Sequence, residues 1–355
     1  MGTLLVAAGG GGDAIAAAVL ADATNTPAVG IATLAWDRLI VDPLPGPRSA
    51  GDFTGLVAKQ GYQIVTPGTR PIPPAGSALP RLAGELQLVL VLLDPTDGAV
   101  GLRREIAAAA DQLGADSIRL VDVGGDVLGR SDDVGLRSPL ADALMAASCI
   151  GLPAAVWVAG PGLDGELPEA VVLQRTGDVP PFLRLDANAW PPYLPILEWH
   201  PSEATALLAA ASLGLRGRVE IRDAGLPVQL TDNSTNVYEL LLAVVAAVNP
   251  LAEALADTTS FAEVEDIARG VLGWTELDAE RAKAARTNQT KPIPADLDTA
   301  LSEWEAEARA RGVEYVTIRR LAEVLGWGDL MKLRAELAVL QSDRPQLPVW
   351  TLRAG

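Results

Sequence analysis

The chain has 355 residues, and its 45 acidic side chains against 28 basic ones give a formal net charge of −17. Phosphate backbones are bound by clustered Lys and Arg, so this balance argues against nucleic-acid binding. Apolar residues make up 49% of the chain and charged residues 21%, values typical of a globular protein rather than a disordered one. Aromatic residues make up only 4%, so Ala, Leu and Val must fill most of the core.

Cys149 is the only cysteine, which excludes an intramolecular disulfide and a thiolate-rich metal site. A reducing cytoplasm fits this composition best. The longest apolar runs, at residues 86–93 and 240–248, are much shorter than the ~20 residues that a membrane-spanning helix needs. We therefore expect a cytoplasmic protein without a membrane segment, and the sequence leaves open whether it forms a homo-oligomer.

The first half of the chain alternates short apolar runs with Ala-rich helical segments, the pattern of a parallel sheet covered by helices on both faces. We expect buried strands at residues 3–8, 29–34, 86–93, 117–121 and 154–158. Helices are expected between them, at residues 14–23, 102–113 and 140–150. A proline-rich segment at residues 42–79 interrupts the alternation as a long loop, with one strand near residues 63–65.

The second half of the chain becomes progressively helical. The patterns predict a helix at 201–213, a strand at 218–221 and a helix at 237–248; beyond residue 250 they predict helices at 296–311, 317–325 and 330–340, and a short strand at 349–352. We therefore predict a doubly wound, mostly parallel, Rossmann-like α/β domain over residues 1–250, which binds the ligand. A mainly helical C-terminal appendage would occupy residues 251–355.

The first expected strand runs into the first expected helix through four glycines and an aspartate, Gly9, Gly10, Gly11, Gly12 and Asp13. Glycines let the backbone turn tightly and expose its amides to a ligand, and the helix N-terminus adds partial positive charge. The spacing fits the G-x-G-x-x-A dinucleotide fingerprint, and Asp37 follows the second strand where it would meet a ribose hydroxyl. A carboxylate at position 13 competes with a pyrophosphate, however, so the alternatives are a helix cap or a ligand for sugar hydroxyls or a divalent cation.

Two further expected strands end in aspartates and glycines. Residues 86–93 run into Asp94 and Asp97, and residues 117–121 run into a second such turn, formed by Asp122, Gly124, Gly125 and Asp126. Ligands of open α/β sheets bind outside the carboxyl ends of the strands, where a change in strand order opens a crevice. We therefore expect five acidic groups to gather on one rim: Asp13, Asp94, Asp97, Asp122 and Asp126. The alternative is that these residues only form loops.

Carboxylates that lie close together repel one another, so some must be protonated, neutralised by Arg or bridged by a cation. Arg137 follows the third of these turns and is a candidate counter-charge or anion clamp. Oxygen ligands suit Mg²⁺ or Ca²⁺, which Asp13, Asp122 and Asp126 would hold. The same rim also suits a polyhydroxylated substrate such as a ribose.

His200 is the only histidine of the chain, and it stands just before Glu203 at the start of an expected helix. The two side chains place a base and an acid in one short segment, so we expect one of them, together with Asp126, to take part in catalysis as a proton-transfer group. The alternative is that His200 is only packed and that Glu203 only caps the helix.

Two other polar segments have two interpretations each. Asn233 and Ser234 belong to a polar turn before an apolar run, and they either line the pocket or cap a helix. The proline-rich stretch at 42–48 is either a surface loop or a rigid lid, with Arg38 or Arg48 facing an anionic group.

The chain resembles a prokaryotic family described only as of unknown function, domain of unknown function 1152. The resemblance depends on the glycines and aspartate at 9–13, Asp42 with Pro43, the turn at 122–126, the segment 137–140 and the segment 232–235. It covers most of the first 250 residues and implies a fold but no activity. A looser similarity to nucleoside hydrolases, which gather aspartates around a ribose and a calcium ion, is an analogy only, since their Asp-rich first-strand signature is absent here.

Together these features predict an enzyme that acts on a small polar substrate, ribosyl, nucleoside or sugar phosphate, by hydrolysis or group transfer at the sugar. Motifs of serine hydrolases, P-loop NTPases and zincins are absent from the sequence. Two alternatives remain: an NAD(P)-dependent oxidoreductase, which would use Asp37 and no metal, and a nucleotide-binding protein without catalytic activity.

Overall fold

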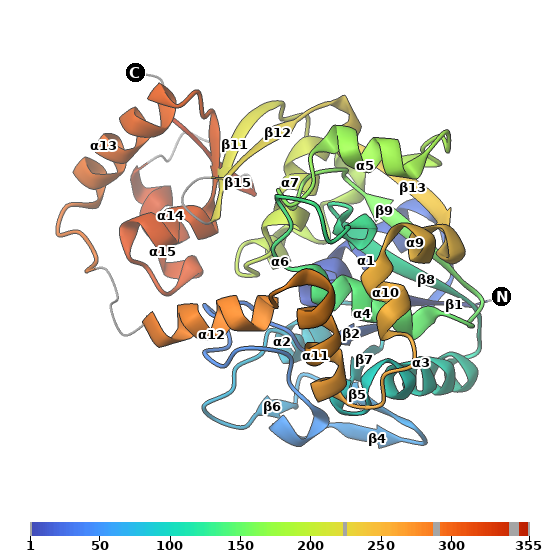
Figure 1. Ribbon diagram of the computed structural model, residues 1–355. Helices are drawn as coiled ribbons and strands as arrows, with labels where there is room; N and C mark the ends of the chain where they lie inside the picture. Colours follow the sequence, from blue (N-terminus) through green and yellow to red (C-terminus); the bar gives the residue numbers. More distant parts are fainter. Residues whose placement is uncertain (1, 223–225, 287–291, 341–347, 354–355) are drawn as a thin grey trace.

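The computed structural model describes residues 2–222, 226–286, 292–340 and 348–353, and shows a mixed α/β protein built around a nine-stranded sheet (Figure 1). Five adjacent strands at its centre are parallel, in the spatial order β9 (Ala154–Ala159), β8 (Ala115–Val123), β1 (Gly2–Ala7), β2 (Ala28–Leu34) and β7 (Leu90–Leu93). The chain thus proceeds outward from β1 in one direction through β2 and β7, and in the other through β8 and β9. The strand order changes direction between β1 and β8.

These five strands confirm the predicted parallel core, although β7 begins four residues later than expected. The residues before it form α2 (Leu79–Glu85) and a short connection. The β7 strand itself has the burial pattern of four consecutive buried residues, as a strand covered on both faces requires.

Antiparallel strands extend both edges of the sheet. On one side lie β5 (Tyr62–Val65), as expected from the sequence, and β4 (Val57–Lys59); on the other lie β13 (Asn236–Leu241) and β10 (Leu183–Arg184). The prediction of one helix over 237–248 was therefore wrong in its first half, and only α9 (Leu242–Val248) is helical. Periodicity alone does not distinguish a short apolar strand from a helix, and pairing with β9 decides the outcome here.

Helices cover both faces of the sheet. Alternate strand residues point to opposite faces: Leu5 and Ala7 pack in one core cluster, and Leu4 and Val6 in the other. The first cluster is closed by α1 (Gly11–Thr24), α2, α6 (Leu194–Leu197) and α7 (Glu203–Ser212). The second is closed by α3 (Gly98–Leu113), α4 (Pro139–Cys149), α9, α10 (Pro250–Leu255) and α11 (Phe261–Leu272). The helices that follow β1 and β8 therefore leave the sheet on opposite sides.

A second, smaller sheet contains strands from both sides of the predicted domain boundary at residue 250. Its strands lie in the order β12 (Leu226–Leu230), β11 (Gly217–Ile221), β14 (Tyr315–Thr317) and β15 (Val349–Thr351). Because β11 pairs with β14, residues from both sides of position 250 share this sheet. The C-terminal region is therefore more than a set of helices: α13 (Leu297–Ala310), α14 (Ile318–Leu325) and α15 (Leu330–Leu340) form a separate apolar core with β14 and β15.

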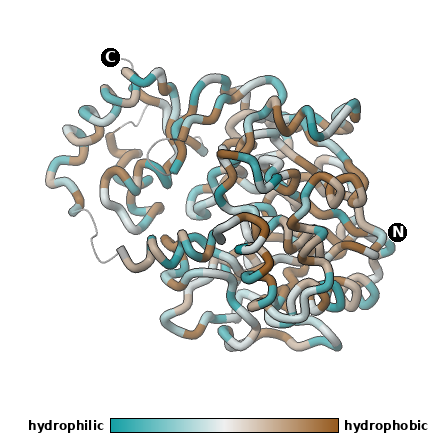
Figure 2. The backbone as a smooth tube through the Cα atoms, in the orientation of Figure 1, coloured by the Kyte–Doolittle hydropathy of each residue, from teal (hydrophilic) through white to brown (hydrophobic). Residues whose placement is uncertain are grey.

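The hydropathy of the backbone follows this division (Figure 2). Hydrophobic segments run through the large sheet, whereas the outer helix α13 alternates hydrophilic and hydrophobic residues, as one covering a core on a single side does. The α12 helix (Glu276–Arg286) lies against the large domain, where the Nε1 of Trp36 donates a hydrogen bond of 3.2 Å to Glu280. The remaining elements are short: β3 (Phe53–Thr54), β6 (Arg70–Pro71) and α5 (Glu169–Thr176).

Among the described residues, no helix combines the length and the apolar character needed to cross a bilayer.

Candidate functional site

The carboxyl ends of β1 and β8 border a cavity of about 80 Å³, at the point where the strand order changes direction. About 10–15 Å³ of such volume holds one water molecule, so this cavity has room for a cation with its waters or for part of a small substrate. Nine carboxylates line it, against three guanidinium groups. Buried negative charge in such excess requires protons or a cation.

The glycine turn forms the floor of the cavity. Gly10 has φ 115°, a conformation that favours glycine, and it is the cap before α1. Asp13, in the first turn of this helix, turns back so that its Oδ2 accepts a 2.6 Å hydrogen bond from the N–H of Gly9. At Gly12 a Cβ atom would lie 2.4 Å from Oγ of Ser202, so the turn must be bare for the segment before α7 to pack on it.

Three aspartates converge at one wall of the cavity. Asp122 is the penultimate residue of β8, Asp126 lies in the turn that follows this strand, and Asp142 projects from the first turn of α4. One carboxylate oxygen of each lies within 4.8 Å of those of the other two. Oδ2 of Asp122 and Oδ1 of Asp142 are buried and lack a hydrogen-bond partner in the described part of the chain. These oxygens are suited to a hard divalent cation.

The electrostatics of this group have a clear physical cause. Burial raises the pKa of Asp122, Asp126 and Asp142 well above the ordinary value, and their negative neighbours raise it further. Burial also raises the pKa of Asp13 to about 7, against the hydrogen bond from Gly9, which lowers it. A proton or a cation bound among these groups would relieve the repulsion.

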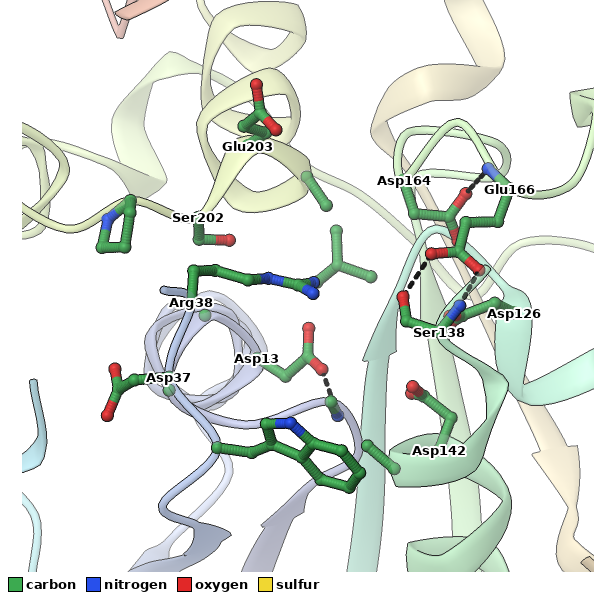
Figure 3. A pocket seen from close by; sticks show the side chains of 18 of the residues that line it. Asp13, Asp37, Arg38, Asp126, Ser138, Asp142, Asp164, Glu166, Ser202 and Glu203 are labelled. Atoms are coloured by element: carbon green, nitrogen blue, oxygen red, sulfur yellow. Dashed lines mark hydrogen bonds between the residues drawn. The ribbon is translucent and has the colours of Figure 1, made fainter. Parts of the chain in front are cut away.

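Two glutamates position the helix that carries Asp142. The Oε2 atom of Glu166 accepts hydrogen bonds of 2.8 Å from the backbone N–H groups of Arg137 and Ser138, just before α4. Glu276 of α12 accepts one of 2.9 Å from the N–H of Leu140. Both carboxylates therefore satisfy amides at the start of α4, where the helix has no acceptors of its own. Figure 3 shows Glu166, Ser138 and Asp142 on the same side of the pocket as Asp126.

The opposite wall is basic. Figure 3 shows the guanidinium of Arg38, which follows β2, above the carboxylate of Asp13 and beside Ser202. Glu203 lies behind, with its carboxylate 3.4 Å from Arg222 and 3.5 Å from Arg319, and it also accepts a hydrogen bond from the hydroxyl of Thr317. We expected Glu203 to transfer a proton; its position at the cavity agrees with the prediction, but its ion pairs favour a role in positioning the two arginines.

His200 lies at the cavity in a single orientation. Its Nδ1 accepts a 3.2 Å hydrogen bond from the N–H of Ser202, which assigns the proton of the neutral ring to Nε2. Nε2 is buried, has no partner among the described residues, and is the atom nearest to where a Cβ of Gly11 would be. Burial, together with the charge of Arg38, lowers the pKa of His200 to about 3, so the ring is neutral at physiological pH.

The expected rim of five aspartates is only partly formed. Asp13, Asp122 and Asp126 line the cavity, but Asp94 and Asp97 are absent from its walls. Asp94 accepts hydrogen bonds from the N–H groups of Ala50 and Thr96, and the exposed carboxylate of Asp97 pairs with Arg104 at 2.8 Å. The β7 strand is separated from β1 by β2, so its turn lies outside the crevice.

Six other predicted residues also lie outside the walls: Gly10, Gly124, Gly125, Arg137, Asn233 and Ser234. The side-chain amide of Asn233 donates a hydrogen bond to Glu169, and the fully buried Ser234 accepts one at its Oγ from the N–H of Thr231. Gly124 and Gly125 instead allow close packing behind the turn. A Cβ atom added at Gly124 would collide with Asp164, and one added at Gly125 would collide with Val172. Of the glycine run, Gly9, Gly11 and Gly12 line the cavity. Arg137 contributes its backbone N–H to Glu166, and its side chain is not part of the walls.

Sequence reasoning missed several acidic groups of the site. Asp142, the third member of the three-carboxylate group, was not predicted; the predicted Asp13 lies beside this group instead. Asp164, Glu166 and Glu276, which complete the acidic wall, were also missed. A signal was present for Asp142, because it is a single charge in a helix whose other residues are all uncharged and buried. No local signal marks Glu276, since it comes from a helix far along the chain.

The fold and this cavity define a mixed α/β protein with a carboxylate-lined pocket at the carboxyl ends of its parallel strands. The profile of a family described as "Protein of unknown function (DUF1152)" matches residues 4–284, and the chain belongs to this family. The resemblance noted in the sequence is thereby confirmed. Comparisons with curated proteins and with solved structures gave no match.

Proposed function

We propose that this protein is a divalent-cation-dependent enzyme that acts on a small hydroxylated substrate of the ribosyl or sugar-phosphate type, by hydrolysis or group transfer at the sugar. The supporting observation is the group formed by Asp122, Asp126 and Asp142, with its unpartnered oxygens in a buried cavity. Mg²⁺ or Ca²⁺ bound there would neutralise the three carboxylates and orient sugar hydroxyls.

Asp13 is the best-placed group for proton transfer. Its pKa of about 7 lets it exist in both protonation states near neutral pH, as a general acid or base requires. The hydrogen bond from Gly9 fixes its carboxylate, and the glycine turn holds it at the end of β1. In hydrolysis, a water oxygen would bond to the anomeric carbon, the bond to the leaving group would break with its electron pair, and the proton of the water would pass to Asp13.

The oxidoreductase alternative has one observation in its favour. The order of the five parallel strands is that of doubly wound dinucleotide-binding folds. Two contacts weigh against it: Asp13 uses the N–H of Gly9, and Asp37 accepts hydrogen bonds from the hydroxyl of Ser77 and the N–H of Ala78 instead of presenting a free carboxylate. The N–H of Gly9 and Oδ2 of Asp37, which this alternative would need for a pyrophosphate and a ribose, are thus already occupied.

Calorimetric titration of the full chain with Mg²⁺ and Ca²⁺ tests the proposal, followed by a panel of nucleosides and sugar phosphates with and without the cation. We expect micromolar to millimolar binding of one cation and turnover that depends on it. Asp126→Asn should reduce cation affinity and turnover by about 100-fold or more, the size expected for loss of a charged ligand.

Asp97→Asn is the matched control, because Asp97 is an aspartate of the neighbouring turn that lies outside the cavity. It should change both quantities by less than about twofold. Absence of cation binding by the unmodified chain, or equal effects of the two substitutions, would rule out the proposed role of this group. A shift of melting temperature with NAD(P) alone would favour the oxidoreductase instead.

A further inference from the structure

The basic wall of the pocket has a feature that the cation site does not use. Three arginines from distant parts of the chain, Arg38, Arg222 and Arg319, border one end of the cavity. Arg222 is paired with Glu203 and Glu166, and Arg319 with Glu203. Arg38 is half-buried, and within the described residues its guanidinium makes no ion pair. The wall therefore has a positive charge available for an anion.

The arginines are close enough to affect one another. Burial lowers the pKa of Arg319, and the positive charges of Arg222 and Arg38 lower it further, while Glu203 opposes the change. Guanidinium groups that crowd together in a pocket are stabilised by an anion that neutralises them. Glu203 does this for the two inner arginines, whereas Arg38, at the front of the wall, interacts with Asp13 only beyond ion-pair distance.

A second, independent group points to the same ligand. The Nε2–H of His200 is a buried donor without a partner among the described residues, and the imidazole is 7% exposed. Nε2 of His200 lies next to Gly11, at the N-terminus of α1. There the N–H groups of Gly11 and Gly12, the first of the helix, have no intrahelical acceptor. Unused donors of three kinds, guanidinium, imidazole and helix amide, thus occur on one side of the cavity.

From this arrangement we infer that Arg38, His200 and the start of α1 form a subsite for a phosphate monoester, so that the substrate is a phosphorylated sugar rather than a free nucleoside. This inference rests on the proposed function. A guanidinium binds two phosphate oxygens at once, and helix amides favour the same anion. The carboxylate wall would repel a phosphate, so the polarity of the pocket orients the substrate: phosphate toward Arg38, hydroxyls toward Asp122, Asp126 and Asp142.

The C-terminal region completes this subsite. Arg319 belongs to α14, beyond residue 284, where the family match ends. It reaches the cavity because β14 pairs with β11 and because Thr317 and Arg319 both contact Glu203. The cation ligands, in contrast, all lie within the matched segment. Recognition of the anionic end of the substrate therefore depends partly on a module outside the family match.

The test is calorimetry on the full chain with ribose 5-phosphate, ribose and inorganic phosphate, with and without Mg²⁺. The unmodified chain should bind ribose 5-phosphate at least about tenfold more tightly than ribose, as a charge-assisted contact implies. Arg38→Gln should abolish this preference and leave Mg²⁺ affinity unchanged. Arg104→Gln, which alters an exposed arginine paired with Asp97, should leave both unchanged.

Each outcome decides the question. Equal affinity for ribose and ribose 5-phosphate, or a preference that survives Arg38→Gln, would overturn the subsite while cation-dependent turnover could still support the proposed function. Loss of Mg²⁺ binding in Asp126→Asn with phosphate binding intact is the expected separation of the two walls. Phosphate binding that depends on Arg38 in a chain that binds no cation would support the subsite and overturn the proposed function.

Discussion

The turns after β7 and β8 look alike in the sequence, since each contains two aspartates beside glycine, yet they lie in opposite surroundings. The side chain of Asp97 is 58% exposed and paired with Arg104, whereas the residue Asp126 is only 6% exposed and faces other carboxylates. The difference lies in the position of the strand. β8 is next to β1, and α1 and α4 leave to opposite faces there; β7 is one strand farther out. Position in the sheet, not local composition, decides which turn faces the cavity.

The largest expected consequence of this comparison is the pH dependence of stability. The pKa of Asp13 is raised from 3.8 to about 7, so the folded chain binds a proton that the unfolded chain has lost. The contribution of this proton to the stability of the fold is therefore fully present at low pH and is lost as the pH rises from about 4 to 7. The free energy of unfolding falls by up to about 4 kcal/mol over this range. Thermal unfolding of the metal-free chain should show stability falling over this range.

Two variants test whether the pH dependence of stability comes from the glycine turn that carries Asp13. Asp13→Asn should reduce the slope without abolishing it, because burial also raises the pKa of Asp122, Asp126 and Asp142, and Asp97→Asn should leave the slope unchanged. Burial also raises the pKa of Glu105, beside Asp94, to about 7, so the difference between variants is the informative quantity. A slope that Asp13→Asn does not reduce would contradict the prediction. Mg²⁺ should raise stability more at pH 8 than at pH 5, because cations and protons compete for the carboxylates.

Gly12→Ala tests how tightly the glycine turn packs against the segment before α7. The added methyl group would lie 2.4 Å from Oγ of Ser202, and we expect a loss of about 1–3 kcal/mol in the free energy of unfolding. Gly270→Ala in α11 is the control, because nothing lies within 4 Å of its added Cβ; it should stabilise the chain by about 0.5–1 kcal/mol. Chemical denaturation measures both. Equal effects would mean that the glycine turn does not contact the segment before α7.

Asp142→Asn has a smaller expected effect on stability than Gly12→Ala, and of the opposite sign. It removes a buried charge that Asp122 and Asp13 repel, so the metal-free chain should gain about 1 kcal/mol while losing its stabilisation by Mg²⁺. Asp97→Asn should shift stability by less than about 0.5 kcal/mol and keep the response to Mg²⁺. Melting curves with and without the cation check both; a retained Mg²⁺ response in Asp142→Asn would exclude it as a ligand.

Much of the large sheet could be predicted because its strands are apolar runs bounded by turn residues. Residues 3–8, 29–34 and 154–158 correspond closely to β1, β2 and β9. The pairing of β11 with β14 could not be predicted, because the two strands are short and lie about a hundred residues apart in the sequence. Local sequence patterns do not indicate this pairing, yet it brings the C-terminal region to the cavity.

The part of the candidate site at the ends of β1 and β8 could be predicted, whereas Asp164 and Glu166, beyond β9, and the residues contributed by α4, α12 and α14 could not. Asp13, Asp122 and Asp126 were found from the rule that ligands bind at the carboxyl ends of parallel strands. Asp142, Glu276 and Arg319 come from helices, whose places around the cavity depend on tertiary packing. The same rule also selected Asp94 and Asp97, because it does not say which strands border the crevice.

The dependence of the pocket on two distant stretches of chain bears on how it is assembled during synthesis. The three grouped aspartates lie within residues 122–142, whereas Arg319 follows 177 positions later (319 − 142). The three aspartates can therefore come together early, from neighbouring parts of the nascent polypeptide, while Arg319 is added only near the end of translation. Changes in the late-made module would then alter what the pocket selects without disturbing how it holds a metal, which separates two properties that evolution can adjust independently.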